Sequence, residues 1–527
     1  MMARLYPVIV VLWLLAGVSR FGEGTSNPGF VARVSRKGLE YACQYGVTIL
    51  NKQLSNLRLP DFLGSYKAGW FGSVSYELHR LKIHHFRLGD SGLDLLPEHD
   101  VGVSLSNNFL QAGGSWKVEK EFITLKGTFD LRMDISISAS LSLGKDQAGR
   151  PTASVAQCSN SIGHVSIDIS GSLSWIFNLF HEKIEHGIKS LLEQEVCKEI
   201  RKLAGSYLEP YLRTLPVTTV IDQFAGIDYS LVGAPQVTAE GLDTSFKGEF
   251  FSLRQRIPVP FVAPAIRLPQ RHDHMFYFAM SQYMFNTASH VYQKAGRTRI
   301  IIQNNQVTNL TNLTSQSARK WWKQNLNLSC LISNSTSLTA MVSCLSSNFL
   351  RLLLQVPTDS PISLQTNLLQ RLFPPLARLF PDMEVEFEAS PESQPLLTFT
   401  PGNVTFMPVM DIRISALQSN SSARRPLLHL MAKANISATI SVRSGRIFGS
   451  VASGSNLKLE LKHSSVSYCC VKLIEVIINH FVFKVVLPSL NAKLQEGFSL
   501  PLPNNTFISS LELQIHKNFL LLAANIN

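Results

Sequence analysis

Residues 129–143 read FDLRMDISISASLSL, in which an apolar side chain at every odd position alternates with Asp, Arg or Ser at every even position. A period of two residues is that of a β-strand with one dry face and one wet face. Strands in globular proteins usually have about three to ten residues, so this stretch predicts an unusually long strand. The fold must therefore supply a long apolar surface to cover its dry face.

Apolar helical patterns lie on both sides of this strand. Residues 29–56 predict a helix that ends before Pro60, and residues 173–212 predict a longer helix with a charged face opposite its apolar one. The apolar positions are Val34, Leu39, Ala42, Val47, Leu50 and Leu54 in the first segment and Ile176, Phe177, Phe180, Ile184, Ile188, Leu191 and Leu192 in the second. Such stripes fill a core in most proteins, so a packed core and a ligand pocket are both open at this point.

The chain divides at a proline-rich stretch. Residues 251–271 contain four prolines, which exclude a helix or a central strand and predict a stiff, extended linker. We expect one domain over residues 25–250 and another over residues 272–527. The second half repeats the plan of the first, with helices expected at 276–296 and 471–494 and strands at 385–387, 412–417, 436–442 and 511–515.

The first residues indicate export from the cell. Residues 1–24 have a basic start, an apolar run and small residues at cleavage spacing, which is the pattern of a signal peptide. Glycosylation sequons fit that compartment and begin at Asn309, Asn312, Asn327, Asn334, Asn403, Asn420, Asn435 and Asn504. Residues 303–352 hold four of them and fit neither domain, so this segment is either a glycosylated surface insertion or a variant or mis-assembled stretch.

Seven cysteines in an oxidising compartment leave at least one unpaired. We favour a disulfide between Cys158 and Cys197, because it would join a strand to the long helix that follows. The other cysteines are Cys43, expected as a buried thiol, Cys330 and Cys344, which can pair locally, and Cys469 and Cys470, which have no evident partner. No Cys-x-x-Cys spacing occurs, so no metal site is expected.

The formal net charge of +12 favours acidic partners such as phosphorylated lipids, although an excess of Lys and Arg over a large surface also serves solubility. Nucleic acid is not expected, because the sequence lacks a basic-aromatic module. Residues 89–92 spell GDSG, the nucleophile motif of trypsin-like proteases, but the required His and Asp are not correctly placed. We therefore expect no enzyme activity, and a secreted hydrolase using Ser91 is a remote alternative.

Six segments closely resemble the bactericidal/permeability-increasing and lipopolysaccharide-binding protein family, and most of all its lipopolysaccharide-binding members. They follow the family's order and cover nearly the whole mature chain except residues 303–352. The segments are NPGFVARVSRKGLEYACQYG (27–46), GRPTASVAQC (149–158), WIFNLFHEKIE (175–185), YLRTLPVTTVIDQFAGIDYSLV (211–232), MFYFAMSQYMFNTASHVYQKAG (275–296) and LQIHKNFLLLAANI (513–526).

The resemblance implies an α+β fold. It would be an elongated boomerang of two pseudo-symmetric, barrel-like domains, in which long helices pack on highly twisted antiparallel sheets, joined by a central sheet and the proline-rich linker. A single disulfide matching Cys158 and Cys197 is implied, as is an apolar pocket for acyl chains, with bound phospholipid in place of any cofactor. The expected pocket residues of the first domain are Val34, Leu39, Val47, Leu50, Ile176, Phe180 and Ile184.

The resemblance also implies an exposed basic tip that binds the phosphates of lipid A. The matching residues are Arg58, Trp116, Lys117, Lys120 and Lys126. Glu119 and Glu121 make this stretch less basic than that role requires, so a merely solvated tip is the alternative.

The expected function is extracellular binding of lipopolysaccharide and phospholipid acyl chains in the innate, antimicrobial response to Gram-negative bacteria. Expected partners are lipopolysaccharide, phospholipid, the bacterial outer-membrane surface or lipoprotein particles, and a host lipopolysaccharide receptor. The main alternative is a phospholipid or neutral-lipid transfer protein without preference for endotoxin.

Overall fold

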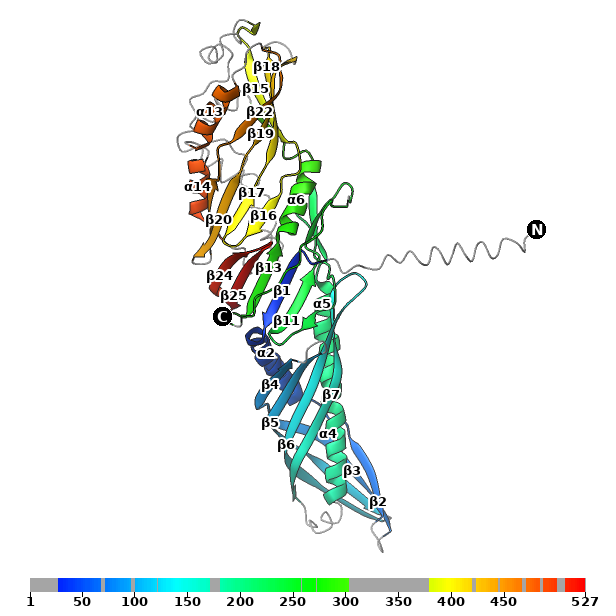
Figure 1. The fold of residues 1–527 in the computed structure, drawn as a ribbon. Helices are drawn as coiled ribbons and strands as arrows, with labels where there is room; N and C mark the ends of the chain where they lie inside the picture. Colours follow the sequence, from blue (N-terminus) through cyan, green and yellow to red (C-terminus); the bar gives the residue numbers. More distant parts are fainter. Residues whose placement is uncertain are drawn as a thin grey trace, which may run out of the picture.

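The computed structural model is an elongated molecule with one sheet at its centre and a helix-covered set of strands on either side (Figure 1). It describes residues 27–67, 72–95, 100–120, 122–170, 181–256, 258–271, 273–302, 379–418, 423–443, 446–466, 471–483, 487–499 and 508–526. Predictions that lie outside these residues are the signal peptide, segment 303–352, Asn309, Asn312, Asn327, Asn334, Asn420, Asn504, Cys330, Cys344, Cys469 and Cys470. Among the described residues, no helix is both long and apolar enough to cross a membrane.

The central sheet joins the two ends of the chain. Its order is β10-β11-β1-β13-β25-β24, with bounds Gln236–Val237, Gly241–Phe246, Phe30–Ser35, Phe276–Ser281, Phe519–Ile526 and Ile508–His516. Strand β1 pairs with β13, which pairs in turn with β25 near the C-terminus, and all these pairs are antiparallel. Buried Val31, Tyr277 and Leu521 form a small core on this sheet. The two halves are thus hydrogen-bonded to each other through the backbone.

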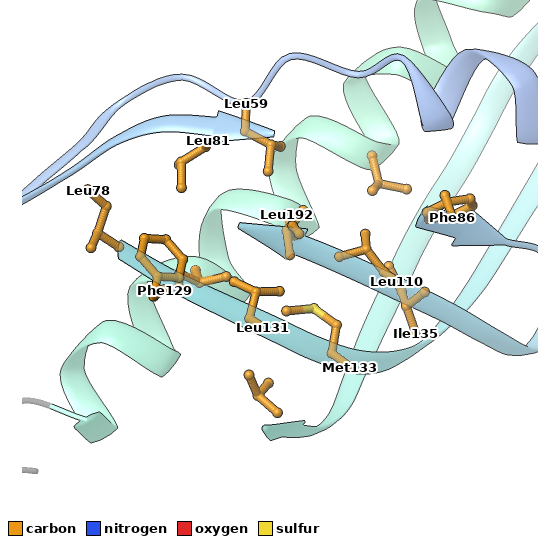
Figure 2. Close-up of a cluster of buried hydrophobic side chains, with 14 of the residues drawn as sticks. Leu59, Leu78, Leu81, Phe86, Leu110, Phe129, Leu131, Met133, Ile135 and Leu192 are labelled. Carbon is orange, nitrogen blue, oxygen red and sulfur yellow. The ribbon is translucent and has the colours of Figure 1, made fainter. Parts of the chain in front are cut away.

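The N-terminal sheet contains the long strand that the alternation predicts. Its strands are β2 (Phe62–Lys67), β3 (Ser73–Arg87), β4 (Asp90–Leu95), β5 (Val101–Lys120), β6 (Ile123–Lys145) and β7 (Pro151–Ser170), ordered β2-β3-β5-β6-β7 with β4 on β5. Strand β6 has 23 residues, which confirms the predicted long strand. Its apolar side chains meet those of β3, β5 and Leu192 in one core (Figure 2).

Two helical segments cover the inner face of this sheet. They comprise α2 (Arg36–Ser55) and the continuous run of α4 (His181–Leu203), the π-helical turn η2 (Ala204–Leu208) and α5 (Glu209–Thr214). The Ser35 hydroxyl caps α2 by accepting a hydrogen bond from the Gly38 N–H at 3.3 Å. Val34 therefore belongs to β1, and its predicted position on the helix face is wrong.

The second half contains two further five-stranded sheets. Their orders are β14-β15-β18-β19-β22 and β16-β17-β20-β21-β23, with bounds Ile300–Ile302, Glu384–Pro391, Val409–Leu417, Arg424–Lys433 and Lys458–Ser464 for the first and Leu397–Thr400, Asn403–Phe406, Ile436–Arg443, Arg446–Ser453 and Phe498–Ser499 for the second. A small sheet of β8 (Thr218–Val220), β9 (Ala225–Asp228) and β12 (Glu249–Ser252) lies before the linker. The helices are α6 (Gln282–Lys294), α13 (Val471–Phe481) and α14 (Leu487–Glu496).

The second half corrects one helix prediction. Residues 276–281 form β13 of the central sheet, and the helix begins only at Gln282, after its N-cap Ser281. Aromatic residues at helical spacing misled the sequence argument, because the strand partner lies near the far end of the chain. The other predicted strands coincide with β15, β18, β20 and β24, and the α+β class with a central sheet is confirmed.

Candidate functional site

The dry face of β6 changes character along its length. Its inward side chains from Phe129 to Ile137 are only 1–3% exposed, so this part lies in a fully packed core. From Ala139 to Gly144 every residue is half-buried instead. The strand continues with apolar residues beyond the point where the packed core ends. Incompletely covered apolar surface therefore lies at the C-terminal end of β6, which is its upper end in Figure 1.

Neighbouring strands extend this surface sideways. The register places Leu95, Val101, Leu141 and Val155 in one row across β4, β5, β6 and β7. Val101 is buried, and the other three are half-buried. Side chains directly opposite each other in adjacent strands point to the same face. The row is therefore a continuous apolar strip that crosses four adjacent strands, with one residue from each, on the helix-covered side of the sheet.

Helix α2 lies over β4 at this level (Figure 1). A hydrogen bond joins Cys43 of the helix to Ser91 of β4, and burial raises the pKa of the Cys43 thiol. Residues three or four positions away share the face of Cys43, and these include Leu39 and Val47, both half-buried. We give the name upper slot to these two half-buried apolar surfaces, the face of α2 that carries Leu39 and Val47 and the four-strand row.

The predicted pocket residues fall into three groups: those at the upper slot, those in the main core, and those that the structure does not describe. Leu39 and Val47 lie on the slot-facing side of α2, although Val47, like Leu50, also packs against the main core. Ile176 and Phe180 lie outside the described residues, and Ile184 lies in α4 with a side chain that is not described. Sequence reasoning missed the contributions of β4 and β7, which depend on strand register.

The disulfide lies at the lower edge of the slot. Cys158 pairs in register with Ala139, the first half-buried position of β6, and bonds to Cys197 of α4. This confirms the predicted bond and fixes α4 against β7 where the packed core ends. A surface hollow of about 450 Å³ lies beside the bond, and its lining includes the two cysteines together with Asn160, Glu193 and Arg201.

The helices also expose aromatic side chains. On α2, Tyr41, Tyr45 and Ile49 are 46%, 70% and 44% exposed at a spacing of four residues. On η2 and α5, Tyr207 and Tyr211 are exposed at the same spacing. Exposed apolar surface concentrated on one helix face is typical of a binding region.

The predicted basic tip differs from expectation. Trp116 is 5% exposed and belongs to the main core, so its predicted place on an exposed tip is wrong. Lys117 forms an ion pair with Glu119, and the hydrogen bond that its ammonium donates to that carboxylate raises the pKa of Lys117. Lys126 lies directly opposite Lys117 in the register and is exposed.

Two tip residues remain. Arg58 is exposed and lies outside the β5–β6 hairpin that carries Lys117 and Lys126. Its backbone forms an isolated β-bridge with Lys82 of β3. Lys120 ends β5, and its side chain is not described. The hairpin thus holds fewer free cations than predicted.

A second polar cluster lies where the linker meets the central sheet. Asp273, His274 and Glu512 place ligand-type atoms within 4.8 Å of one another. Arg271, however, donates to both carboxylates, at 2.7 Å to Asp273 and 3.1 Å to Glu512. The hydrogen bond from Tyr277, followed by that from Arg271, holds the pKa of Asp273 well below its usual value. The arginine already occupies the position of a cation, so this cluster is an ion-pair network linking the linker to β24.

The remaining motif residue, Ser91, lies on β4 with Cys43 as its hydrogen-bond partner. The GDSG stretch is therefore the start of a strand at the slot, with Asp90 paired opposite Ser106.

Comparison with known proteins gives consistent matches across the chain. Residues 38–211 match the family model described as "LBP / BPI / CETP family, N-terminal domain", and residues 219–321 and 323–527 match its C-terminal domain. The chain is 38% identical to the lipopolysaccharide-binding protein of Homo sapiens over 526 residues, covering 100% of this chain and 98% of that one. It is 31% identical to the bactericidal permeability-increasing protein of Rattus norvegicus, covering 98% and 97%.

A solved structure agrees with these matches. The crystal structure of lipopolysaccharide binding protein superposes with a TM-score of 0.54 at 34% identity, and covers 95% of this chain and 99% of that chain.

Proposed function

Because this chain belongs to the LBP / BPI / CETP family, we propose that it is a secreted protein that binds lipopolysaccharide and phospholipid through their acyl chains. Relatives named for lipopolysaccharide binding and bacterial permeability support a role in the innate response to Gram-negative bacteria. The same names make lipopolysaccharide and the bacterial outer-membrane surface the first partners to test, and we add phospholipid because it also carries acyl chains. Lipoprotein particles and a host lipopolysaccharide receptor are further candidates.

The observation that carries this proposal is the half-buried apolar row of the upper slot. Packed interiors do not leave Leu95, Leu141 and Val155 half-buried beside one another, because such surface is costly to expose. Burying one methylene group contributes about 0.8 kcal/mol, so a single acyl chain lying along the row offsets the cost of association. No charged group is required for that step.

Native mass spectrometry of the secreted protein tests the proposal. We expect phospholipid to be carried by the wild-type protein and to be lost from a Leu141→Trp variant, whose indole fills the slot. Ser138→Trp on the exposed face of the same strand is the matched control and should keep its lipid. A wild-type protein that carries no lipid, or a control that loses it equally, contradicts the proposal.

The second candidate is a lipid transfer protein without preference for endotoxin. The ion pair between Lys117 and Glu119 favours it, because a neutralised lysine binds phosphate weakly. Titration with labelled lipid A and with labelled phosphatidylcholine separates the two: saturable binding of phosphatidylcholine alone supports transfer, and preferential binding of lipid A supports the first proposal. A hydrolase remains the remote alternative, and hydrolysis abolished in a Ser91→Ala variant would be needed to support it.

A further inference from the structure

The surface hollow beside the disulfide has a lining that lipid binding does not use. Its volume of about 450 Å³ lies within the range that is usual for small-ligand sites, roughly 300–1,000 Å³. The residues that line it are Cys158, Ser159, Asn160, Glu193, Gln194, Cys197 and Arg201. Both cysteines of the disulfide therefore border a hollow that is large enough for a small ligand.

Helix α4 places two charged side chains symmetrically about the disulfide. Glu193 and Arg201 lie four residues before and four residues after Cys197, so all three share one helix face. The other Glu, Lys and Arg side chains between residues 185 and 202 form ion pairs along the helix, namely Glu185 with Lys189, Glu195 with Lys198 and Glu199 with Lys202. Glu193 and Arg201 are exposed and form no ion pair with any other described residue. The hollow thus has an anion at one end, a cation at the other and the disulfide between them.

The spacing of these two charges fits a short peptide. Eight helical residues, each with a rise of about 1.5 Å, separate Glu193 from Arg201 by roughly 12 Å. Three extended peptide residues span about 10 Å. A tripeptide whose ammonium group meets Glu193 and whose terminal carboxylate meets Arg201 therefore has its central residue at the disulfide. Glutathione has an ammonium group at one end, a free glycine carboxylate at the other and a cysteine in the middle.

The two sulfur atoms of the disulfide are not equivalent toward an incoming thiol. Cys158 is half-buried, whereas Cys197 is only 5% exposed, so a thiolate has better access to Cys158. The side-chain N–H of Asn160 donates to Cys197 Sγ at 3.6 Å, and Arg201 lies one helical turn away. A hydrogen-bond donor and a nearby cation both stabilise a thiolate, and a stabilised thiolate is the better leaving group. Attack at Cys158 with departure of Cys197 is the favoured direction.

We propose that the hollow binds a peptide thiol of the glutathione class, which opens the disulfide by exchange. The glutathione thiol first loses its proton to solvent, and the resulting thiolate attacks Cys158 Sγ. A new disulfide forms between glutathione and Cys158, the bond to Cys197 breaks, and its electron pair stays on Cys197 as a thiolate. The exchange consumes no other oxidant or reductant, and attack of the Cys197 thiolate on the mixed disulfide reverses it.

Exchange releases α4 from β7 at the lower edge of the upper slot. Cys158 lies opposite Ala139, where the packed core of β6 ends, so the bond to Cys197 fixes the helix at that boundary. Carried phospholipid should therefore leave the opened protein faster. This consequence rests on the proposed lipid-binding function, whereas the exchange reaction does not.

Mass spectrometry of the full-length, folded protein after incubation with glutathione tests the site. Quenching with N-ethylmaleimide should give glutathione on Cys158 and maleimide on Cys197. The reference thiol is 2-mercaptoethanol, which has no charged ends, and each rate is normalised to the rate of the same thiol with a neutral small-molecule disulfide. The normalised rate should be about tenfold higher for glutathione, at about threefold for each of two exposed ion pairs.

Substitutions in α4 separate a built site from general charge attraction. Arg201→Gln and Glu193→Gln should each lower the ratio of the two normalised rates about threefold, and Arg201→Lys should largely keep it. Glutathione ethyl ester, in which the glycine carboxylate is blocked, should react about threefold more slowly than glutathione with wild type but not with Arg201→Gln. Lys198→Gln is the matched control, because it removes an exposed cation of the same helix that is paired with Glu195 and does not line the hollow. Its ratio should equal that of wild type.

Three results overturn the proposal: glutathione on Cys197 instead of Cys158, no exchange in the folded protein, or equal ratios in Arg201→Gln and Lys198→Gln. The release of labelled phosphatidylcholine tests the consequence for lipid separately. Faster release after exchange supports it, and unchanged release with glutathione on Cys158 overturns that consequence. Absence of carried lipid from wild type refutes the proposed function, while exchange at Cys158 that depends on Arg201 still supports the thiol site.

Discussion

Two leucines of β6 should respond differently to truncation by alanine. Leu131 is 1% exposed in the packed core, so Leu131→Ala leaves a cavity and should lower the free energy of unfolding by about 3 kcal/mol. Leu141 is half-buried in the upper slot, so Leu141→Ala removes less buried surface and should cost about 1 kcal/mol in lipid-free protein. The difference arises because only Leu131 is surrounded on every side.

Affinity for lipid should rank the two variants in the reverse order, with the larger loss at Leu141. An acyl chain lying on Leu141 loses contact worth about 1.4 kcal/mol when the side chain is truncated, which weakens binding of labelled phosphatidylcholine roughly tenfold. Leu131→Ala should leave that affinity unchanged, because Leu131 lies below the slot. Amide hydrogen exchange in β6 peptides measures the stability of this half, and fluorescence titration measures the affinity. Similar stability losses at both positions, with no effect on affinity, would refute the reasoning.

Three further predictions concern the disulfide, the N-cap of α2 and the ion-pair network where the linker meets the central sheet. Replacing Cys158 and Cys197 by serine opens a loop with a sequence separation of 39 and should lower the free energy of unfolding by about 4 kcal/mol, measured by urea denaturation under matched conditions. Ser35→Ala should cost about 1 kcal/mol or more, because the hydroxyl caps α2 and also donates to the His274 carbonyl at 2.7 Å; helix amide exchange detects it. The lowered pKa of Asp273 stabilises the junction above about pH 4, the unfolded value, and this contribution is lost as the pH falls further. Acidification should therefore speed amide hydrogen exchange in β24 of the wild-type protein, and this increase should be smaller in Asp273→Asn.

Local patterns allowed the long strand and most helices to be predicted. A period of two residues over 129–143 has a single interpretation, and β6 follows it. Strand β5 has the opposite parity, with the even-numbered Trp116 and Val118 buried and Glu119 exposed. The alternation of Trp116 and Val118 with Lys117 and Glu119 is itself a period of two, so residues 116–119 alone could have indicated a buried Trp116 and a carboxylate near Lys117.

Pairing between distant segments could not be predicted in this way. Strands β1 and β13 were assigned to helices because their partners lie hundreds of residues away in the chain, and no local period reveals them. The row of Leu95, Val101, Leu141 and Val155 likewise depends on the register of four strands.

Photo-crosslinking with phosphatidylcholine that carries a diazirine on its acyl chain tests the central claim most directly. After irradiation and proteolysis, labelled peptides from residues 139–144 of β6 and from β4 and the first half of α2 are the predicted result. Labelling confined to other surfaces, or no labelling at saturating lipid, would contradict a hydrocarbon site between this helix and the upper end of the sheet.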